Sequence, residues 1–566
     1  MKFADMKYTR VSVAEVEEAV NELCAALKDA ADAETAIKAA HRYFDFSRKL
    51  GTSSALCYTR HTIDTRDEFY TAEQDYYDEN MPLMQKYLDQ ANDAFLNCPM
   101  KDALKSSIGE LFFTKLANEK KLFNESVIPD MQEENKLDSA YTKLIGAAKL
   151  QFDGKELNLA QILPYCTSPD RETRKKATET YYSYFADHSK EFDEIYDNMV
   201  KVRARIAEKL GFKNYQEMSF CFMERFDYTP DMVRTYRDEV KKYLVPLVTR
   251  LKEKQRKRLG YDKLYFYDLD YYFNSGNPKP VGTADELVEK ARVMYHELSE
   301  ESGAFFDFMT ENDLMDLLAK PGKTNGGYCI TFDSLKTPFI FANFNGTKDD
   351  VEVLTHEAGH ALQSYLSMRE IDIPAYINPS LDACEIHSMS MELITRPWME
   401  SFFGSDTEKF LYSQLENILD FVPYGCLVDE FQENIYANPN MTPDERKALW
   451  LKLQKEYQPH IDYDGIAFLE AGGRWQRQSH IYTRPFYYID YTLAQICAVQ
   501  FFIRFEKKDP DAWKDYLDLC RIGGSKTFVS LVEDVAHLPS PFKSGVLAET
   551  LDYLANMLEN IDDSKF

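Results

Sequence analysis

Residues 351–366 read VEVLTHEAGHALQSYL, and the expectations for this chain start from them. Thr347, Asp349 and Asp350 precede the segment and are typical of a helix N-terminus, where acidic side chains offset the positive end of the helix dipole. Within it, HEAGH at 356–360 places two histidines four residues apart. Residues four apart share one face of an α-helix, so both imidazoles can reach one ion. The pattern predicts a metal-binding helix.

Glu357 follows the first histidine directly and can reach a water molecule held as a further ligand. A chain of this composition would contain HExxH by chance only about 0.03 times, even if every acidic residue were counted as Glu. The alternative is a helix whose histidines, His356 and His360, are surface residues or satisfied core residues. The motif therefore favours a catalytic metal site.

A catalytic zinc site normally has three protein ligands and one open position, so a third ligand is needed. The segment 379–398, PSLDACEIHSMSMELITRPW, predicts a second helix with four potential donors: Asp382, Glu385, His387 and Glu392. Glu385 and Glu392 share a face, and His387 points roughly opposite to Glu385. Burying an acid among apolar residues is costly unless it is paired or binds metal. The spacing favours Glu385 over His387 without excluding the histidine.

The rest of the chain predicts a mostly α-helical protein. Gly and Pro number only 22 each in 566 residues, and apolar residues recur at three- and four-residue intervals. The best candidate boundary lies near residues 166–177, where Ser-Pro-Asp precedes a new helical pattern, and it divides the chain into residues 1–166 and 167–566. The clearest predicted helices are Val13–Leu27, Leu83–Leu96, Glu179–Leu210 and Pro230–Leu259, the last with Thr229 as its cap.

One interval, residues 321–347, resembles β-strand because β-branched and aromatic residues are bounded by Gly, Pro and Asn. It predicts a small sheet beside the metal helix. Its last part, FIFANFNGT at 339–347, is expected to pair with an extended peptide through backbone hydrogen bonds. Two Gly-rich turns, Asn325–Gly327 and Ala471–Gly473, are candidates for loops that close over a substrate.

Composition and charge exclude several classes of protein. With 44% hydrophobic residues the chain can build a large core, and its net charge of −27 argues against nucleic acid or an anionic membrane as a partner. No apolar run approaches the roughly 20 residues that span a bilayer, and the acidic start does not resemble a secretory signal. Ten cysteines occur singly, without a CxxC pair, as expected for a cytoplasmic protein.

The motifs together resemble a known family. HEAGH with a glutamate 25 residues beyond its second histidine, in the context EIHSMSMEL, is similar to the thimet-oligopeptidase-like zinc metallopeptidases, and most of all to their oligoendopeptidase F and Pz-peptidase branch. The similarity extends to the strand run TPFIFANFNGT and to the late aromatic segment HIYTRPFYYIDYTLAQ. It implies one zinc ion per chain, held by His356, His360 and Glu385.

The resemblance also implies an architecture and a function. The expected fold is mostly α, a two-lobed helical bundle with a deep central channel and a small sheet beside the metal helix. Residues 1–166 would form an N-terminal helical domain, and residues 167–566 a catalytic domain. The expected activity is that of a zinc-dependent endo-oligopeptidase, which hydrolyses internal bonds of short peptides and excludes folded proteins.

Glu357 is expected to act as general base toward the water and then as general acid toward the leaving amine. Ligating histidines usually donate their second ring N–H to a carboxylate or carbonyl. Glu352, four residues before His356, is one candidate for that role, and Glu392 is a candidate near Glu385.

Catalysis also needs a donor for the developing oxyanion. By resemblance to the family, His480, Tyr488 and Tyr491 are expected to line the substrate face. The segment is one residue shorter than in the animal enzymes between His480 and the first of these tyrosines, which leaves Tyr487 as an alternative to Tyr488.

Two rival functions stay open. The first is a metallopeptidase of similar helical fold that releases dipeptides from the C-terminus. Such an enzyme needs a cation to hold the substrate carboxylate, and the only candidate for that cation is Arg484, in the aromatic segment. The second is an inert helical scaffold. Two histidines and a carboxylate also suit cobalt or manganese in place of zinc.

Overall fold

The computed structural model describes residues 1–320, 322–324 and 326–566. Pro321, in the predicted strand interval, and Asn325, in one predicted Gly-rich turn, lie outside the described residues. Helices contain 70% of the residues, and the sheets are small. The prediction of a mostly helical fold with a small sheet beside the metal helix is confirmed.

The chain forms two compact units, each assembled from three stretches of sequence. Unit 1 contains Met1–Lys121, Lys279–Thr407 and Cys497–Leu538, and unit 2 contains Leu122–Pro278, Glu408–Ile496 and Pro539–Phe566. The predicted boundary between sequence domains at residue 166 stays a prediction.

Unit 1 holds five N-terminal helices, a three-stranded sheet, and helices that precede and follow this sheet in the sequence. They are α1 (Val13–Lys28), α2 (Ala33–Ile63), α3 (Glu68–Leu96), α4 (Lys101–Ile108), α5 (Glu110–Glu119), α13 (Ala284–Leu298), α14 (Glu300–Glu311), β3 (Met315–Leu318), β4 (Tyr328–Phe332), β5 (Thr337–Phe344), α15 (Asp349–Glu370), α16 (Leu381–Ile394), α17 (Met399–Phe403), α23 (Ala512–Ile522) and α24 (Phe528–Ser530).

Unit 2 is helical apart from one two-stranded hairpin. Its elements are α6 (Ile128–Gly146), β1 (Leu150–Phe152), β2 (Lys155–Leu157), α7 (Leu163–Cys166), α8 (Arg171–Asp187), α9 (Ser189–Lys209), α10 (Tyr215–Phe222), α11 (Pro230–Glu239), α12 (Val245–Arg258), α18 (Thr407–Ala437, from Glu408 on), α19 (Pro443–Tyr457), α20 (Ala467–Glu470), α21 (Ser479–Thr483) and α25 (Val546–Asn560), while the residues of α22 (Tyr488–Glu506) are divided between the units.

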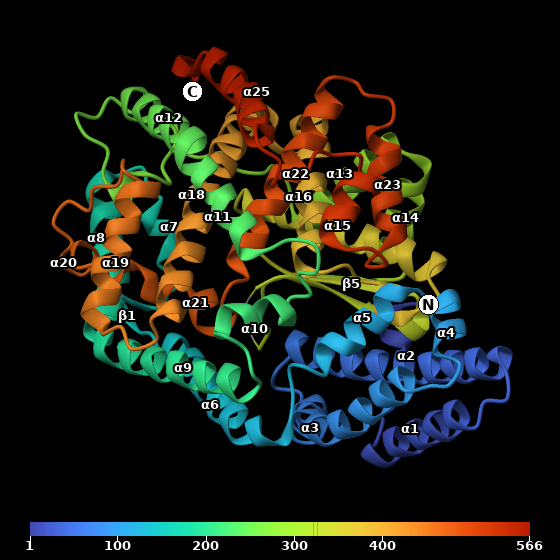
Figure 1. Cartoon of the computed structure of the whole chain (residues 1–566). Helices are drawn as coiled ribbons and strands as arrows, with labels where there is room; N and C mark the ends of the chain where they lie inside the picture. The colour runs from blue at the N-terminus through green and yellow to red at the C-terminus, as the bar shows by residue number, and fades with distance from the viewer. Residues whose placement is uncertain (321, 325) are drawn as a thin grey trace. The chain divides into compact units, whose positions relative to one another are not determined.

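The first three helices of unit 1 pack against one another (Figure 1). α1 begins at a capping box, in which the Ser12 side chain accepts from the Glu15 backbone N–H and Glu15 returns a bond to the Ser12 N–H. Its buried residues Val16, Val20 and Leu23 recur at helical spacing. Burial of this apolar stripe against α2 and α3 holds the group together.

The sheet of unit 1 has the strand order β3-β5-β4. β5 pairs in parallel with β3 and antiparallel with β4, so both of its edges are occupied. The expectation that residues 339–347 accept a peptide strand is therefore wrong for β5, because its backbone groups already bond to its neighbours. The two edges that stay open in the described sheet belong to β3 and β4.

The predicted helices are mostly found, with two departures. The predicted helix Pro230–Leu259 consists of α11, a π-helical stretch at Val240–Leu244, and α12. The pattern across Glu179–Leu210 predicts a continuous helix, but α8 ends at Asp187 and α9 begins at Ser189, with His188 between them. Thr229 caps α11, as predicted, by accepting from the Met232 backbone N–H at 3.4 Å. Among the described residues, no helix is both long and apolar enough to cross a membrane.

Candidate functional site

α15 and α16 approach each other closely, and a glycine permits it. A Cβ atom added to Gly359 would lie 2.6 Å from the backbone oxygen of His387 and 2.8 Å from the Cα of Ser388. Both distances are shorter than real Cβ contacts, so any larger residue would force the helices apart. The glycine inside HEAGH thus brings the two histidines beside α16.

Three side chains converge where the helices meet. Glu385 Oε2 lies 3.4 Å from His356 Nε2 and 3.6 Å from His360 Nε2. One ligand atom from each of the three residues can be chosen so that all lie within 4.8 Å of one another. Two imidazole nitrogens and a carboxylate oxygen at such separations are the donors that a divalent cation such as zinc takes.

The other donors considered from the sequence lie elsewhere. His387 is fully buried, with Nε2 3.4 Å from the Leu519 carbonyl oxygen and Nδ1 3.2 Å from the Cys384 carbonyl oxygen. Asp382 accepts from the Ser380 hydroxyl at 2.6 Å, at the start of α16. The structure therefore brings Glu385 to the histidines, and not His387 or Asp382.

The second nitrogen of each histidine has a different neighbour. His356 Nδ1 is 2.6 Å from Glu392 Oε1, and His360 Nδ1 is 3.5 Å from Cys384 Sγ. Both neighbours lie on α16, on either side of Glu385. Glu352, the other predicted partner of His356, instead accepts from Lys348 Nζ at 2.6 Å. Cys384 was missed in the sequence, although it immediately precedes Glu385.

Charge at the site favours bound cations. Burial alone would lower the pKa of His356, but hydrogen bonds to Glu385 and Glu392 raise it to about 10. Burial opposes ionisation of Glu385, yet the two histidines hold its pKa well below the ordinary value. Burial raises the pKa of Glu352 to about 7, against the opposite effect of Lys348. The carboxylates of Glu385 and Glu392 thus favour positive charge beside the His356 imidazole.

Glu357 lies on the same helix as the histidines and is 7% exposed. Its Oε2 accepts no hydrogen bond from any described residue. Burial raises the pKa of its carboxyl group, although His356 and His360 act in the opposite direction. An unpaired buried carboxylate oxygen is costly, so a partner supplied from solution is expected there.

The residues present fit a metal ion on these observations. The three donor atoms are close, the surroundings are acidic, and the buried Glu357 oxygen lacks a partner within the described chain. Structural zinc sites with four protein ligands are closed, whereas three ligands leave a position for water. The donor set is therefore of the catalytic type.

The predicted substrate-face residues cluster within unit 2. The ring centroid of His480, on α21, lies 5.0 Å from that of Tyr488 and 6.0 Å from those of Tyr487 and Tyr491. Tyr488 and Tyr491, both on α22, are 5.7 Å apart. The distances bring Tyr487 and Tyr488 into the same cluster, with Tyr488 nearer to the imidazole. Arg484 is exposed just after α21.

Two residues that sequence reasoning missed hold His480. Gln478 Nε2 is 2.9 Å from His480 Nδ1, and the Tyr424 hydroxyl donates to Gln478 Oε1 at 2.7 Å. An amide N–H that donates to Nδ1 leaves the ring proton on Nε2. Gln478 could have been predicted as a neighbour of His480, because the two residues are close in the sequence. Tyr424 lies 54 residues before Gln478, so nothing in the nearby sequence links it to this site.

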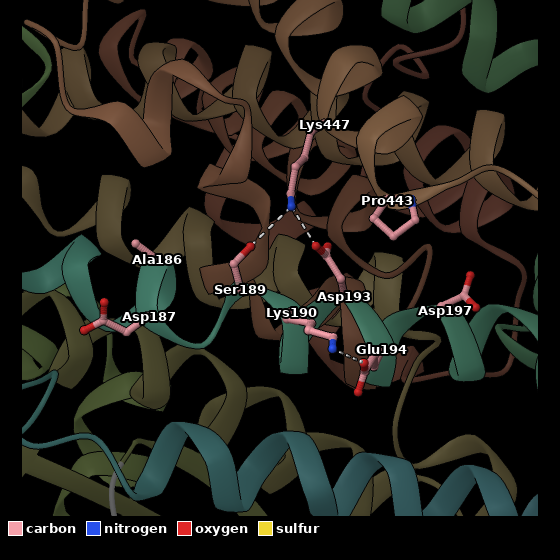
Figure 2. Close-up of a pocket in the computed structure, with 9 residues that line it drawn as sticks. All are labelled: Ala186, Asp187, Ser189, Lys190, Asp193, Glu194, Asp197, Pro443 and Lys447. Carbon is pink, nitrogen blue, oxygen red and sulfur yellow. Dashed lines mark hydrogen bonds and ion pairs between the residues drawn. The ribbon is translucent and has the colours of Figure 1, made fainter.

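A surface pocket in unit 2 lies apart from these residues (Figure 2). Three of its four acidic side chains are paired: Asp193 accepts from Lys447 at 2.6 Å, Asp197 accepts from Arg446 at 2.8 Å, and Glu194 lies 3.7 Å from Lys190. The fourth acidic residue of the lining is Asp187. Its lining residues are Ala186, Asp187, Ser189, Lys190, Asp193, Glu194, Asp197, Pro443 and Lys447.

Comparison with known sequences identifies the family. Residues 165–541 match peptidase family M3, and residues 3–123 match the peptidase M3 N-terminal domain. An oligoendopeptidase F homolog of Borreliella burgdorferi is 24% identical over 473 residues, which are 79% of this chain and 75% of that protein. Oligopeptidase PepF of Bacillus subtilis is 22% identical over 428 residues, covering 72% of this chain and 61% of PepF.

Solved structures give closer matches. Pz peptidase A with an inhibitor superposes with a TM-score of 0.94 at 46% identity, and the match covers 100% of both chains. A Bacillus anthracis protein described as an oligoendopeptidase F superposes with a TM-score of 0.90 at 42% identity, covering 100% of this chain and 99% of that one. The resemblance found in the motifs is confirmed: the chain belongs to peptidase family M3, in its oligoendopeptidase F and Pz-peptidase branch, and is a metalloendopeptidase.

Proposed function

We propose that this protein is a zinc-dependent endo-oligopeptidase that hydrolyses internal bonds of short peptides, with one zinc ion per chain held by His356, His360 and Glu385. The observation that carries the proposal is the convergence of the two Nε2 atoms and Glu385 Oε2 beside Glu357. Family membership and the names of the relatives support peptide substrates. Ten free cysteines are consistent with a reducing, cytoplasmic location.

Zinc bound by this donor set supplies Lewis acidity, which lowers the pKa of water toward ~7 and polarises the carbonyl group of the scissile bond. Glu357 removes a proton from the attacking water as the new carbon–oxygen bond forms. The same carboxyl group then gives this proton to the amide nitrogen as the carbon–nitrogen bond breaks. The products are one free carboxylate and one free amine.

The remaining residues orient the metal ligands and stabilise the oxyanion. Glu392 accepts the Nδ1 proton of His356 and thereby leaves Nε2 free to bind the ion. Glu352 is paired with Lys348 and helps to fix the start of the metal helix. His480, Tyr488 and Tyr491 donate hydrogen bonds to the oxyanion that develops on the substrate carbonyl. The clustering of these three rings supports a shared role.

A ladder of peptides with blocked ends, from about five to thirty residues, tests the proposal when products are mapped by mass spectrometry; a zinc site of this donor set predicts hydrolysis. Internal cleavage of the shorter peptides is expected. Cleavage that requires a free C-terminus would establish a dipeptide-releasing enzyme instead. A protein that binds zinc and cleaves none of the peptides would be a scaffold.

A further inference from the structure

The histidines of the metal site are held unequally by α16. Glu392, a carboxylate, lies 2.6 Å from His356 Nδ1, whereas the atom facing His360 Nδ1 is the sulfur of Cys384, at 3.5 Å. A separation of 3.5 Å is a hydrogen-bond distance for sulfur, which is larger than oxygen. The His360 imidazole therefore lies between Glu385 Oε2 on its Nε2 side and a thiol on its Nδ1 side.

Metal binding decides which of these atoms donates. A neutral histidine that gives its Nε2 lone pair to an ion carries its proton on Nδ1, and that N–H needs an acceptor. With an ion on Nε2, the Nδ1–H of His360 would face Cys384 Sγ, and the sulfur would be its acceptor. Sulfur accepts hydrogen bonds weakly compared with a carboxylate. His360 is consequently held less firmly than His356.

The backbone fixes Cys384 in this position. Gly359, next to His360, packs against the His387 backbone, three residues after Cys384 on the same helix. The hydroxyl of Tyr516, on α23, donates to the same His387 carbonyl oxygen at 2.9 Å and holds this turn of α16. The thiol thus faces the imidazole through packing of the two helices and not through a mobile loop.

We propose that Cys384 is a positioning residue for His360: its sulfur accepts the Nδ1 proton, selects the tautomer with a free Nε2, and sets how tightly the ion is held on that side. The inference rests on the proposed function, because it assigns His360 as a metal ligand. It adds an acceptor that makes the two histidine ligands chemically distinct.

The test compares three substitutions at residue 384 in the full-length protein. Cys384→Ser keeps an acceptor, Cys384→Val keeps the approximate volume without one, and Cys384→Ala removes both. Zinc affinity is measured by competition with a chromophoric chelator, and the visible absorption of the Co²⁺-loaded protein reports ligand geometry. Cys24→Ser, on α1 with its thiol facing the Gln90 carbonyl oxygen, is the control for the chemical change alone.

We expect Cys384→Val and Cys384→Ala to lose roughly 10- to 100-fold in zinc affinity, as is usual when the partner of a ligating histidine is removed. Cys384→Ser should stay within about threefold of the parent protein and keep the Co²⁺ spectrum, because its hydroxyl still accepts. Circular dichroism of the metal-free proteins checks that all variants fold.

Parent-like zinc affinity and an unchanged Co²⁺ spectrum in Cys384→Val would overturn the inference while leaving the proposed function intact. Equal losses in the serine and valine variants would also overturn it, because packing and not the acceptor would then be responsible. A parent protein that binds no zinc would instead refute the proposed function, so the two failures are distinguishable.

Discussion

Glu357 has the position of a proton carrier, since it is buried, on the metal helix, and has an oxygen without a partner in the described chain. Glu357→Gln keeps the shape of the side chain but cannot accept a proton. We expect the variant to bind zinc as the parent does and to lose roughly 100- to 10,000-fold in kcat, the usual contribution of a general base. Zinc content and steady-state kinetics measured on one preparation check both parts.

Glu370→Gln, at the exposed end of the same helix, is the matched control and should retain activity. A Glu357→Gln protein that cleaves peptides at the parent rate would rule out the assignment of the base.

Glu392 and Glu352 were both predicted partners of the metal site, and their contacts separate them. Glu392 is next to His356 Nδ1, whereas Glu352 is paired with Lys348. We expect Glu392→Ala to weaken zinc binding roughly 10- to 100-fold, and Glu352→Gln to change it less than about threefold. Chelator competition measures both constants. Equal effects would show that the Glu392 contact does not orient the ligand.

Tyr491 lies with its ring centroid 6.0 Å from that of His480 in the cluster of unit 2. If its hydroxyl donates to the oxyanion, Tyr491→Phe should lower kcat by roughly 100-fold and change KM little. Parallel Tyr487→Phe and Tyr488→Phe variants decide between those neighbours, and Tyr488 is expected to have the larger effect. An unchanged kcat in Tyr491→Phe would exclude its hydroxyl from the transition state.

At the residue scale, contacts within one helix could be predicted, whereas most contacts between helices could not. Glu385 is the exception, since its spacing favoured it as a partner of the histidines without excluding His387. His356, Glu357 and His360 share a helix, so their spacing alone indicates that they lie together. The partners of the two Nδ1 atoms depend on the rotation of α16 against α15, which the sequence of neither helix contains. For the same reason Tyr424, on α18, could not be linked to Gln478 on sequence grounds.

At the scale of elements, the contact of α15 with α16 depends on the missing side chain of Gly359. Gly359→Ala should reduce the free energy of unfolding by about 1–3 kcal/mol, because its Cβ meets backbone atoms that cannot move away cheaply. Zinc affinity should fall with it, since both ligand helices shift. Urea unfolding and chelator competition measure the two effects.

Gly51→Ala is the control for the glycine prediction. Gly51 lies in α2, also in unit 1, and nothing would come within 4 Å of its added Cβ. That substitution should be neutral or stabilise by up to about 1 kcal/mol through helix propensity. A Gly359→Ala protein as stable as Gly51→Ala would mean that the helices tolerate separation.

The elements themselves were predicted better than their pairing. The helical spacing and the strand-like composition of residues 321–347 indicated α15 and the β4–β5 hairpin. The order β3-β5-β4 could not be foreseen, because β3 is four residues long and pairs in parallel with β5 rather than with β4, the next strand in the sequence. The hairpin of β1 and β2 was missed, although the pair Asp153-Gly154 is a sequence signal for a two-residue hairpin turn. Both residues have the positive φ that such a turn requires.

At the scale of the whole molecule, two buried histidines, His387 and His460, make stability depend on pH, because burial lowers the pKa of each to about 4. Burial lowers the pKa of His460 to about 4, with Lys252 and Arg474 adding to the effect and Asp420, 3.7 Å away, opposing it. In the unfolded chain the pKa is about 6.5. Between these values only the unfolded chain binds the proton, so stability present above pH 6.5 is lost as the pH falls toward 4.

Unfolding of the metal-free protein at pH 7 and pH 4.5 tests this dependence. The full shift of the His460 pKa corresponds to about 3 kcal/mol in the free energy of unfolding at the acidic limit. His460→Asn should remove most of this contribution from the difference in unfolding free energy between the two pH values. His537→Asn, at a histidine whose side chain is 60% exposed, should leave the difference unchanged. If His460→Asn lost as much stability at pH 4.5 as the parent protein does, groups other than His460 would be responsible for the acid sensitivity.

Unit 1 is built from three separate stretches of sequence, and its metal helices contact α23 from the last of them. Tyr516, which bonds to the His387 carbonyl oxygen, follows that residue by 129 positions. A ribosome adding about 5–20 residues per second needs roughly 6 to 26 seconds to cover that distance. While it is being made, the chain has all of the proposed metal ligands but not the helix that supports them, so a working protease is expected to form only after α23 has left the ribosomal exit tunnel.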